Sequence, residues 1–258
     1  MTVESDAASS IARSEVPDRV LYDRMEANLL ASWEVYAAGS AGASVERVPG
    51  AAVAVFPSLP ERTVYNNAVL ARDLHAAAAD DAVSSTQAIY ADAGIEGYAV
   101  WVHEGDRTSI DVLEEHGYRA DMSTRAMAMS LDASLMRRPQ LALGPTDWQE
   151  YLRILQVPEG LLAGADAGAF HVRIATADGA SVAAAMTYDH AGDCGIYNVV
   201  TVPHARRRGL GTALTSLLLH EARDRGCTTA SLQATEMAER VYANVGFRDL
   251  GRFLEYVT

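Results

Sequence analysis

The chain has 258 residues, of which 49% are hydrophobic and 21% charged, and its formal net charge at pH 7 is −13. This composition is typical of a globular protein, and the length suits two small domains better than one. The acidity repels nucleic-acid phosphates, and no apolar run reaches the roughly 18–20 residues of a membrane-spanning helix. We therefore expect a soluble protein that binds neither nucleic acid nor membrane.

The first half carries most of the acidity: residues 1–140 hold −10 of the net charge and residues 141–258 hold −3. A negative surface attracts cationic ligands. The chain has only two cysteines, Cys194 and Cys227, with no Cys-x-x-Cys pair and no secretory leader pattern. We predict free thiols in a reducing cytoplasm, with Cys194 as a turn residue and Cys227 as a small buried side chain rather than nucleophiles, since neither has a histidine at useful spacing. The scattered histidines predict no metal site.

The first half begins with an aperiodic tail at 1–17 and continues with apolar side chains at helical spacing. Its later segments alternate between helical and extended patterns, broken at turn residues. The elements predicted there are a helix at 18–38, strands at 44–48 and 51–56, a helix at 80–93, a strand at 98–103, a helix at 109–116 and a strand at 125–131.

A linker is predicted at 134–140, after which the pattern begins again. Three successive strands joined by Gly-containing turns favour antiparallel hairpins. The predicted elements are a helix at 148–156, strands at 170–176, 181–188 and 195–202, a helix at 211–225, a strand at 228–233, a helix at 238–244 and a strand at 250–257. The fold class is therefore α/β, in two units, 18–133 and 141–258, each with a mixed, mostly antiparallel sheet flanked by helices.

The chemistry is concentrated where the strand at 195–202 ends, because Arg206–Arg208, Gly209 and Gly211 follow it directly and a helix begins there. Glycine lets the backbone approach a phosphate closely, and the free N–H groups of a helix N-terminus bind anions. The loop is therefore predicted to bind a pyrophosphate. A solvated run of surface arginines is the alternative.

This loop resembles motif A of the GNAT superfamily, Arg/Gln-x-x-Gly-x-Gly/Ala, and the segment from Ala238 through Tyr242 to Gly246-Phe247 resembles its motif B. The resemblance implies an acetyl-CoA-dependent N-acetyltransferase with acetyl-CoA as acyl donor and no metal. Tyr242 would be the general acid, although packing in the core is the alternative reading of this residue. The implied cofactor-binding residues are Val200, Thr201, Val202, Arg207, Arg208, Gly209, Leu210, Gly211, Thr212 and Ala213.

The resemblance further implies that the strands at 195–202 and 228–233 splay apart to admit the thioester, and that a backbone N–H near Val202 stabilises the oxyanion. No motif fixes the base that takes the amine proton; the candidates are Glu159, Asp189 and, through water, Tyr197. Many relatives have an asparagine where this chain has Thr235, and a hydroxyl replaces only part of the bonding of an amide.

The first half also resembles a GNAT unit, because His116-Gly117-Tyr118-Arg119 follows a strand and a helix as Val245-Gly246-Phe247-Arg248 does in the second half. It has no Arg-x-x-Gly-x-Gly, so the resemblance implies a tandem GNAT protein whose N-terminal copy is degenerate and helps to wall the acceptor pocket. An unrelated α/β cap is the alternative.

The expected acceptor is a primary amine on a small molecule, because the acidic first half would attract cations. The alternatives are acetylation of a protein N-terminus or lysine, and a coenzyme-binding sensor without turnover. Acceptor choice is expected to lie in loops such as 158–168, and the sequence leaves the oligomeric state open, a homodimer being one alternative.

Overall fold

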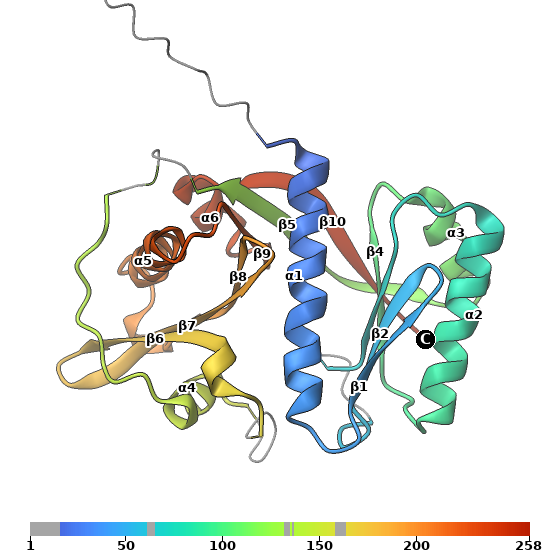
Figure 1. Cartoon of the computed structure of the whole chain (residues 1–258), viewed down its shortest axis with the longest axis horizontal. Coiled ribbons are helices and arrows are strands. Elements are labelled where there is room, and N and C mark those ends of the chain that lie inside the picture. Colours follow the sequence, from blue (N-terminus) through green and yellow to red (C-terminus); the bar gives the residue numbers. More distant parts are fainter. Residues whose placement is uncertain (1–15, 61–64, 132–134, 136, 158–163) are drawn as a thin grey trace, which may run out of the picture.

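The computed structural model describes residues 16–60, 65–131, 135, 137–157 and 164–258. These residues form one ten-stranded sheet with the order β1-β2-β3-β4-β10-β5-β9-β8-β7-β6, flanked by helices (Figure 1). The described strand pairs are antiparallel except for β3 with β4 and β8 with β9. The expectation of a mixed, mostly antiparallel α/β fold is confirmed.

The N-terminal half follows the predicted order closely, and its first helix has the predicted bounds. The elements are α1 (Asp18–Ala38), β1 (Ser44–Val48), β2 (Ala51–Val55), β3 (Asn67–Leu70), α2 (Ala76–Asp92), β4 (Ala99–His103), α3 (Arg107–Glu115) and β5 (Arg119–Ser130). The short strand β3 was not predicted, because its four residues are all buried and so show no alternation of apolar and polar side chains.

The C-terminal half contains every predicted helix and strand, with ends shifted by a few residues at most. The elements are α4 (Trp148–Leu155), β6 (Phe170–Ala177), β7 (Ala180–His190), β8 (Asp193–Thr201), α5 (Leu210–Asp224), β9 (Thr229–Ala234), α6 (Glu239–Val245) and β10 (Arg248–Val257), with single 3-10 turns at Ala167–Ala169 and Pro203–Ala205. Within the described ranges, no helix has the length and hydropathy needed to cross a membrane.

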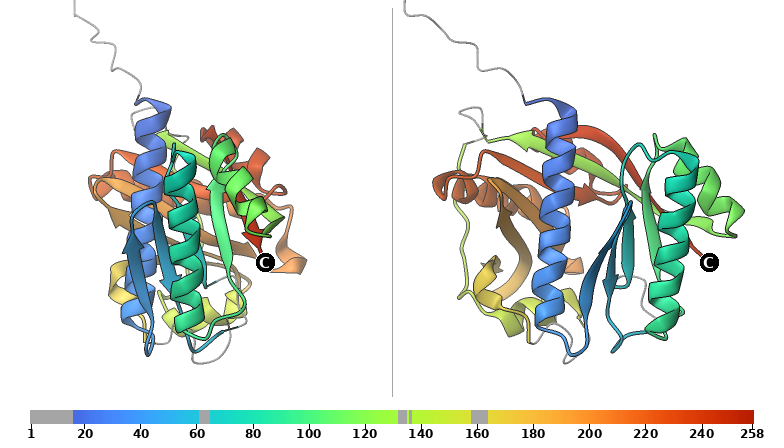
Figure 2. Two further views of the ribbon diagram at one scale, coloured as in Figure 1. Left: turned by 90° about the vertical axis from the view of Figure 1, so that its right-hand side faces the viewer. Right: turned by 45° about the vertical axis from the view of Figure 1, so that its right-hand side comes forward.

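The two faces of the sheet are covered by different helices. Neighbouring residues of β8 show the division: Ile196 packs in the cluster that contains the apolar residues of α5, whereas Tyr197 packs with residues of α1 and α4. The same alternation places α2 and α3 on the α5 face in the N-terminal half. Helix α1 lies across the middle of the opposite face, between the two halves (Figures 1 and 2).

The last strands of the two halves are exchanged, which corrects the expectation of a separate sheet in each half. β10, the last strand of the chain, lies between β4 and β5, and β5 pairs in turn with β9. The exchange joins both halves in one ladder, so neither half leaves an unpaired edge at the centre of the molecule. It also brings side chains from both halves next to the parallel pair β8–β9.

Candidate functional site

The parallel pair β8–β9 separates along its length. The two strands are in register only at Asp193–Thr229, Cys194–Ala230 and Gly195–Ser231. Beyond these three pairs, β8 continues to Thr201 and β9 to Ala234 without pairing with each other. The predicted splay is confirmed, and it leaves free backbone edges on both strands that an extended ligand can pair with.

A buried carboxylate holds the closed end of the splayed pair. Asp193 on β8 is 1% exposed and accepts hydrogen bonds from Thr229 Oγ1 at 2.7 Å and Ser231 Oγ at 2.6 Å, both on β9. From α1, Asn28 Nδ2 donates to the carbonyl of Asp193 at 3.0 Å. Burial raises the pKa of Asp193 above its ordinary value. These bonds fix the point at which the strands part.

The N-terminus of α5 lies just beyond the open end of β8 and has no side-chain cap. Its first helical bond runs from Ala213 N to the Gly209 carbonyl at 2.9 Å, so the N–H groups of Leu210, Gly211 and Thr212 have no acceptor within the helix. Gly209 has φ +76°, and a Cβ on Gly211 would meet nothing within 4 Å. The arrangement leaves room for an anion and three donors to bind it.

The arginines of the loop play two different structural parts. Arg206 Nε donates to the Thr201 carbonyl at 3.1 Å and so ties the loop to the end of β8. Arg207 has φ +61°, and both Arg207 and Arg208 are exposed, with no ion pair to another described residue. Their guanidinium groups are therefore available to a phosphate at the helix N-terminus.

The expectation that Val202 supplies a free N–H is wrong. Its N–H donates to the Val182 carbonyl on the β7 side at 3.0 Å. Residues of an antiparallel strand face their partner alternately, so the backbone of Thr201 points to the opposite edge, towards β9. Of the three residues predicted to pair with a cofactor, Val200, Thr201 and Val202, it is therefore Thr201 that presents its N–H to the splay.

A β-bulge interrupts β8 next to this edge. Ala184 pairs with Val200 and Met186 with Tyr197, so that two residues, Asn198 and Val199, oppose the single residue between them on β7. Asn198 has φ +53°, the left-handed conformation that releases a backbone group from regular pairing. The bulge therefore places backbone groups of β8 next to the splay outside the regular β7–β8 ladder.

Tyr242 lies on the α5 face of the sheet, on α6. It is 9% exposed and packs edge-on against Phe247, with ring centroids 5.9 Å apart. Burial raises its pKa to about 12, so the phenol keeps its proton at neutral pH. Its hydroxyl makes no hydrogen bond to another described residue and is free to donate one.

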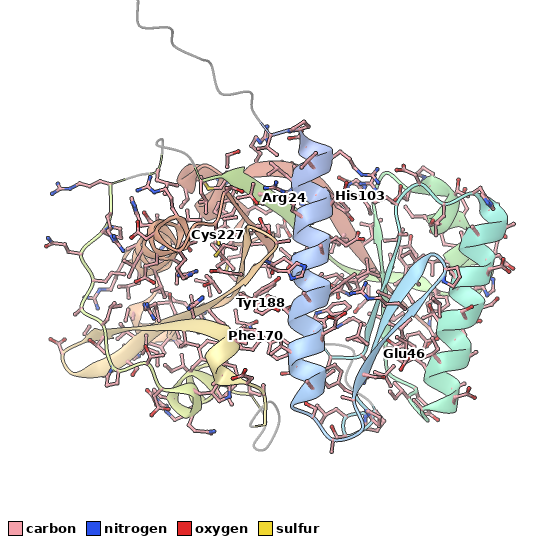
Figure 3. All side chains as sticks on the ribbon, viewed as in Figure 1. Arg24, Glu46, His103, Phe170, Tyr188 and Cys227 are labelled. Atoms are coloured by element: carbon pink, nitrogen blue, oxygen red, sulfur yellow. The ribbon has the colours of Figure 1, made fainter. Side chains whose placement is uncertain are left out.

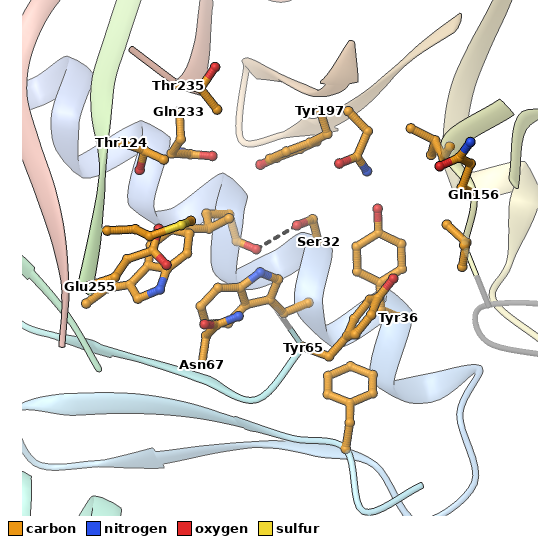
Figure 4. A pocket seen from close by; sticks show the side chains of 18 residues that line it. Ser32, Tyr36, Tyr65, Asn67, Thr124, Gln156, Tyr197, Gln233, Thr235 and Glu255 are labelled. Atoms are coloured by element: carbon orange, nitrogen blue, oxygen red, sulfur yellow. Dashed lines mark hydrogen bonds between the residues drawn. The ribbon is translucent and has the colours of Figure 1, made fainter. Parts of the chain in front are cut away.

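A cavity of about 550 Å³ lies on the opposite, α1 face. It extends from the splayed strands β8 and β9 across β5 to β10 and is covered by α1 and the end of α4 (Figure 4). Its described walls come from both halves of the chain and combine aromatic with polar and aliphatic side chains. The aromatic residues are Trp33, Tyr36, Phe56, Tyr65, Trp101 and Tyr197, and the polar residues include Asn198, Gln233, Thr235 and Glu255.

The three residues predicted as bases are Glu159, Asp189 and Tyr197. Glu159 lies outside the described residues. The carboxylate of Asp189 accepts hydrogen bonds from Arg225 Nε at 2.6 Å and from Arg225 Nη2 at 2.9 Å. Burial raises the pKa of Asp189, but the interactions with Arg225 outweigh burial, so this pKa lies below its ordinary value. Tyr197 lines the cavity, yet its hydroxyl donates to Asn28 Oδ1 at 2.7 Å, and burial raises its pKa well above the ordinary value. Neither of the two described candidates is suited to take a proton directly.

Glu255 of β10 was not predicted. It lines the cavity, and its carboxylate makes no hydrogen bond or ion pair with another described residue. Burial, with a contribution from Asp121, raises its pKa to about 6. No local motif surrounds it, and only the exchange of β10 into the centre of the sheet brings it to the cavity.

The two cysteines are free, as predicted, and Cys227 is buried within the C-terminal half (Figure 3). Cys194, expected in a turn, is instead a buried residue of β8. Burial raises the pKa of both thiols, that of Cys227 to about 12, which keeps them protonated and unreactive. Among the described residues, no three His, Cys, Asp or Glu side chains gather closely enough to hold a metal ion.

The open helix N-terminus beside a splayed parallel pair agrees with the comparison with known families. Residues 134–247 match the family model described as Acetyltransferase (GNAT) family. The chain contains a GNAT domain. Acetyl-CoA is the cosubstrate of this family, and the residues at the start of α5 fit its pyrophosphate: three free N–H groups, two exposed arginines and an unobstructed glycine.

Solved structures share the fold over nearly the whole chain, including the half that precedes the GNAT domain. A GCN5-related N-acetyltransferase from Kribbella flavida is 17% identical, with a TM-score of 0.69 over 95% of this chain and 96% of that one. One from Sphaerobacter thermophilus is 16% identical, with a TM-score of 0.58 over 94% and 93%. No curated protein matches this chain in sequence.

The GNAT domain gives a direct test of the anion site. We expect Gly211→Val to weaken acetyl-CoA binding at least about tenfold, because its side chain would fill the space in front of the free N–H groups. The free energy of unfolding should change by less than about 1 kcal/mol, since the added Cβ meets no described atom within 4 Å outside its chain neighbours and the backbone of its own helix. Titration calorimetry and thermal unfolding measure the two quantities.

Ala77→Val is the matched control, because Ala77 is likewise the second residue of its helix, α2, and is exposed. This variant should bind acetyl-CoA as the wild type does. Equal affinities for Gly211→Val and the wild type would show that the pyrophosphate binds elsewhere.

Proposed function

We propose that the protein is an acetyl-CoA-dependent N-acetyltransferase that acetylates a primary amine of a small molecule. The observation that carries the proposal is the position of the splay: the open stretch between β8 and β9 has an uncapped helix N-terminus on one side and the cavity on the other. A cofactor entering from the α5 face and an amine in the cavity would meet there.

The residues divide the work as follows in this proposal. The amides of Gly209, Leu210, Gly211 and Thr212, with the side chains of Arg207 and Arg208, bind the pyrophosphate, and Thr201 pairs with the pantetheine arm. The N–H of Ala213, predicted to contact the cofactor, is instead used within the helix, where it donates to the Gly209 carbonyl. Acetyl-CoA supplies the activated acyl group when bound. A backbone N–H of the bulge at Asn198 and Val199 stabilises the carbonyl oxygen of the acyl group as it gains negative charge.

Tyr242 completes the site as the general acid. Its protonated phenol donates to the departing thiolate, and its free hydroxyl and raised pKa suit this task. The amine must lose a proton as it forms the new bond. Tyr197 and Asp189 are both engaged by other side chains, so in this proposal a water molecule in the cavity carries the proton away from the amine.

We also propose the division into a degenerate N-terminal GNAT-like unit at 18–133, a linker at 134–140 and a catalytic unit at 141–258. Both halves contain a parallel strand pair joined by a helix, β3-α2-β4 and β8-α5-β9. In the N-terminal half the corresponding helix start is closed, because His75 Nδ1 accepts from Ala78 N at 3.2 Å.

The ends of β3 and β4 are also tied together in that half. Arg72 Nε, after β3, donates to Asp106 Oδ2, after β4, at 2.6 Å, and Asp73 N donates to Asp106 Oδ1 at 3.3 Å. This bridge occupies the place that a splayed pair would leave open. We therefore expect calorimetry to give one acetyl-CoA per chain; a stoichiometry near two would contradict the assignment of a single cofactor site.

Thiol release from acetyl-CoA across a library of small amines tests the activity itself. Turnover with at least one free amine supports the proposal. Turnover with peptides alone would favour a protein acetyltransferase, and binding of coenzyme without turnover on any acceptor would favour a sensor.

A further inference from the structure

The cavity combines aromatic walls with a single charged group. Among its described lining residues, Glu255 is the one with a charged side chain, and no arginine or histidine faces the space. Aromatic faces and a carboxylate both bind cations, whereas a carboxylate or phosphate on a ligand would find no positive partner on these walls. The described walls therefore suit a cationic ligand without an anionic group.

Glu255 lies at one end of the cavity, and the splay lies at the other. The strand order β10-β5-β9 separates Glu255 from β9 by two strand spacings, about 10 Å across the sheet. Glu255 also pairs with Met122, whereas the last residue of β9, Ala234, pairs with Arg125, three residues along β5, so Glu255 lies about 14 Å from the end of β9. Between them the cavity wall is formed by Met122 and Thr124 of β5 and by Gln233 of β9 (Figure 4). At this distance the carboxylate cannot contact an amine that reacts within the splay.

The surroundings of the Glu255 carboxylate nevertheless favour the binding of a cation. The carboxylate is partly buried and lacks an ion-pair partner among the described residues, and its raised pKa of about 6 leaves it ionised above neutral pH. Nearby, Asp121 adds negative charge. A buried carboxylate without a counter-ion is costly, and a ligand ammonium would remove that cost.

We infer that the acceptor is a diamine or a similar small molecule with a second cationic group, which Glu255 binds while the neutral amine reaches the splay. This inference rests on the proposed function and specifies its substrate class. The span between the carboxylate and the splay suits about five or six methylene groups between the two nitrogens. Glu255 is a positioning and specificity residue in this scheme.

The test compares 1,5-diaminopentane with 1-aminopentane, which differ by one cationic group. For the wild type, kcat/KM should be at least about tenfold higher with the diamine, and Glu255→Gln should remove most of that ratio by raising KM for the diamine. A series of diamines should show an optimum at intermediate length. Glu46→Gln, on the exposed face of β1, should keep the wild-type ratio.

Calorimetric binding of the same two amines, without acetyl-CoA, separates this inference from the proposed function. Tighter binding of the diamine that Glu255→Gln abolishes supports the inference even if no acetylation occurs. Acetylation of both amines with equal kcat/KM and equal affinity would overturn it while leaving the proposed function intact. An equal fall in kcat for both amines in Glu255→Gln would also overturn it, because Glu255 would then act at the reacting nitrogen.

Discussion

Replacing Tyr242 with phenylalanine should lower kcat by about 10²–10³-fold while leaving the affinity for acetyl-CoA nearly unchanged. The phenol would donate its proton only as the thiolate departs, so its loss affects the transition state more than binding. Phenylalanine keeps the ring that packs against Phe247, and the hydroxyl makes no bond to another described residue. Thermal unfolding should therefore change little. Steady-state kinetics and calorimetry measure the separate effects.

The pH profile adds a second test of the same role. Because burial raises the pKa of Tyr242 to about 12, the acid should remain protonated and the rate should show no alkaline fall below about pH 10. Tyr256→Phe is the matched control, since this buried tyrosine donates to Glu114 at 3.1 Å in the other half of the sheet. A Tyr242→Phe enzyme with more than about a third of wild-type kcat would assign the acid role to another group.

Most of the local structure could be predicted from the sequence because it depends on local patterns. The apolar spacing of residues 18–38 predicts helix α1, and the glycines after β8 indicate where helix α5 begins. Such patterns say nothing about which strands pair across the molecule. The exchange of β5 and β10 depends on contacts between residues more than 100 positions apart, such as Phe253 with Thr124, and could not be read from periodicity.

The proposed cofactor site could be predicted for the same reason, and the cavity proposed for the acceptor could not. The loop from Arg206 to Gly211 is contiguous, so its phosphate-binding character is visible in the sequence. The described walls of the cavity come from α1, α4 and six strands, and Glu255 reaches it through the exchanged strand. The hydrogen bond that occupies the N–H of Val202 could also be found only from the structure, because the register of the strands decides which amides remain free.

Asp193→Ala should lower the free energy of unfolding by about 2–4 kcal/mol and weaken acetyl-CoA binding. The substitution leaves the buried hydroxyls of Thr229 and Ser231 without their acceptor, and each unsatisfied group costs about 1–3 kcal/mol. It also removes the bonds that fix where β8 and β9 part, so the free edges that would hold the cofactor become less well positioned. Denaturant unfolding and calorimetry measure the two effects.

Asp193→Asn gives the control, because one amide oxygen can still accept a hydrogen bond from either hydroxyl. Burial raises the pKa of Asp193, so the folded state binds this proton more tightly than the unfolded state does, and the group's contribution to stability declines as pH rises above about 4. Asparagine does not titrate, so its variant should lose less stability than the wild type between acidic and neutral pH. If Asp193→Ala matched the wild type in stability and in acetyl-CoA affinity, the splay would have to be fixed by the sheet and α1 alone.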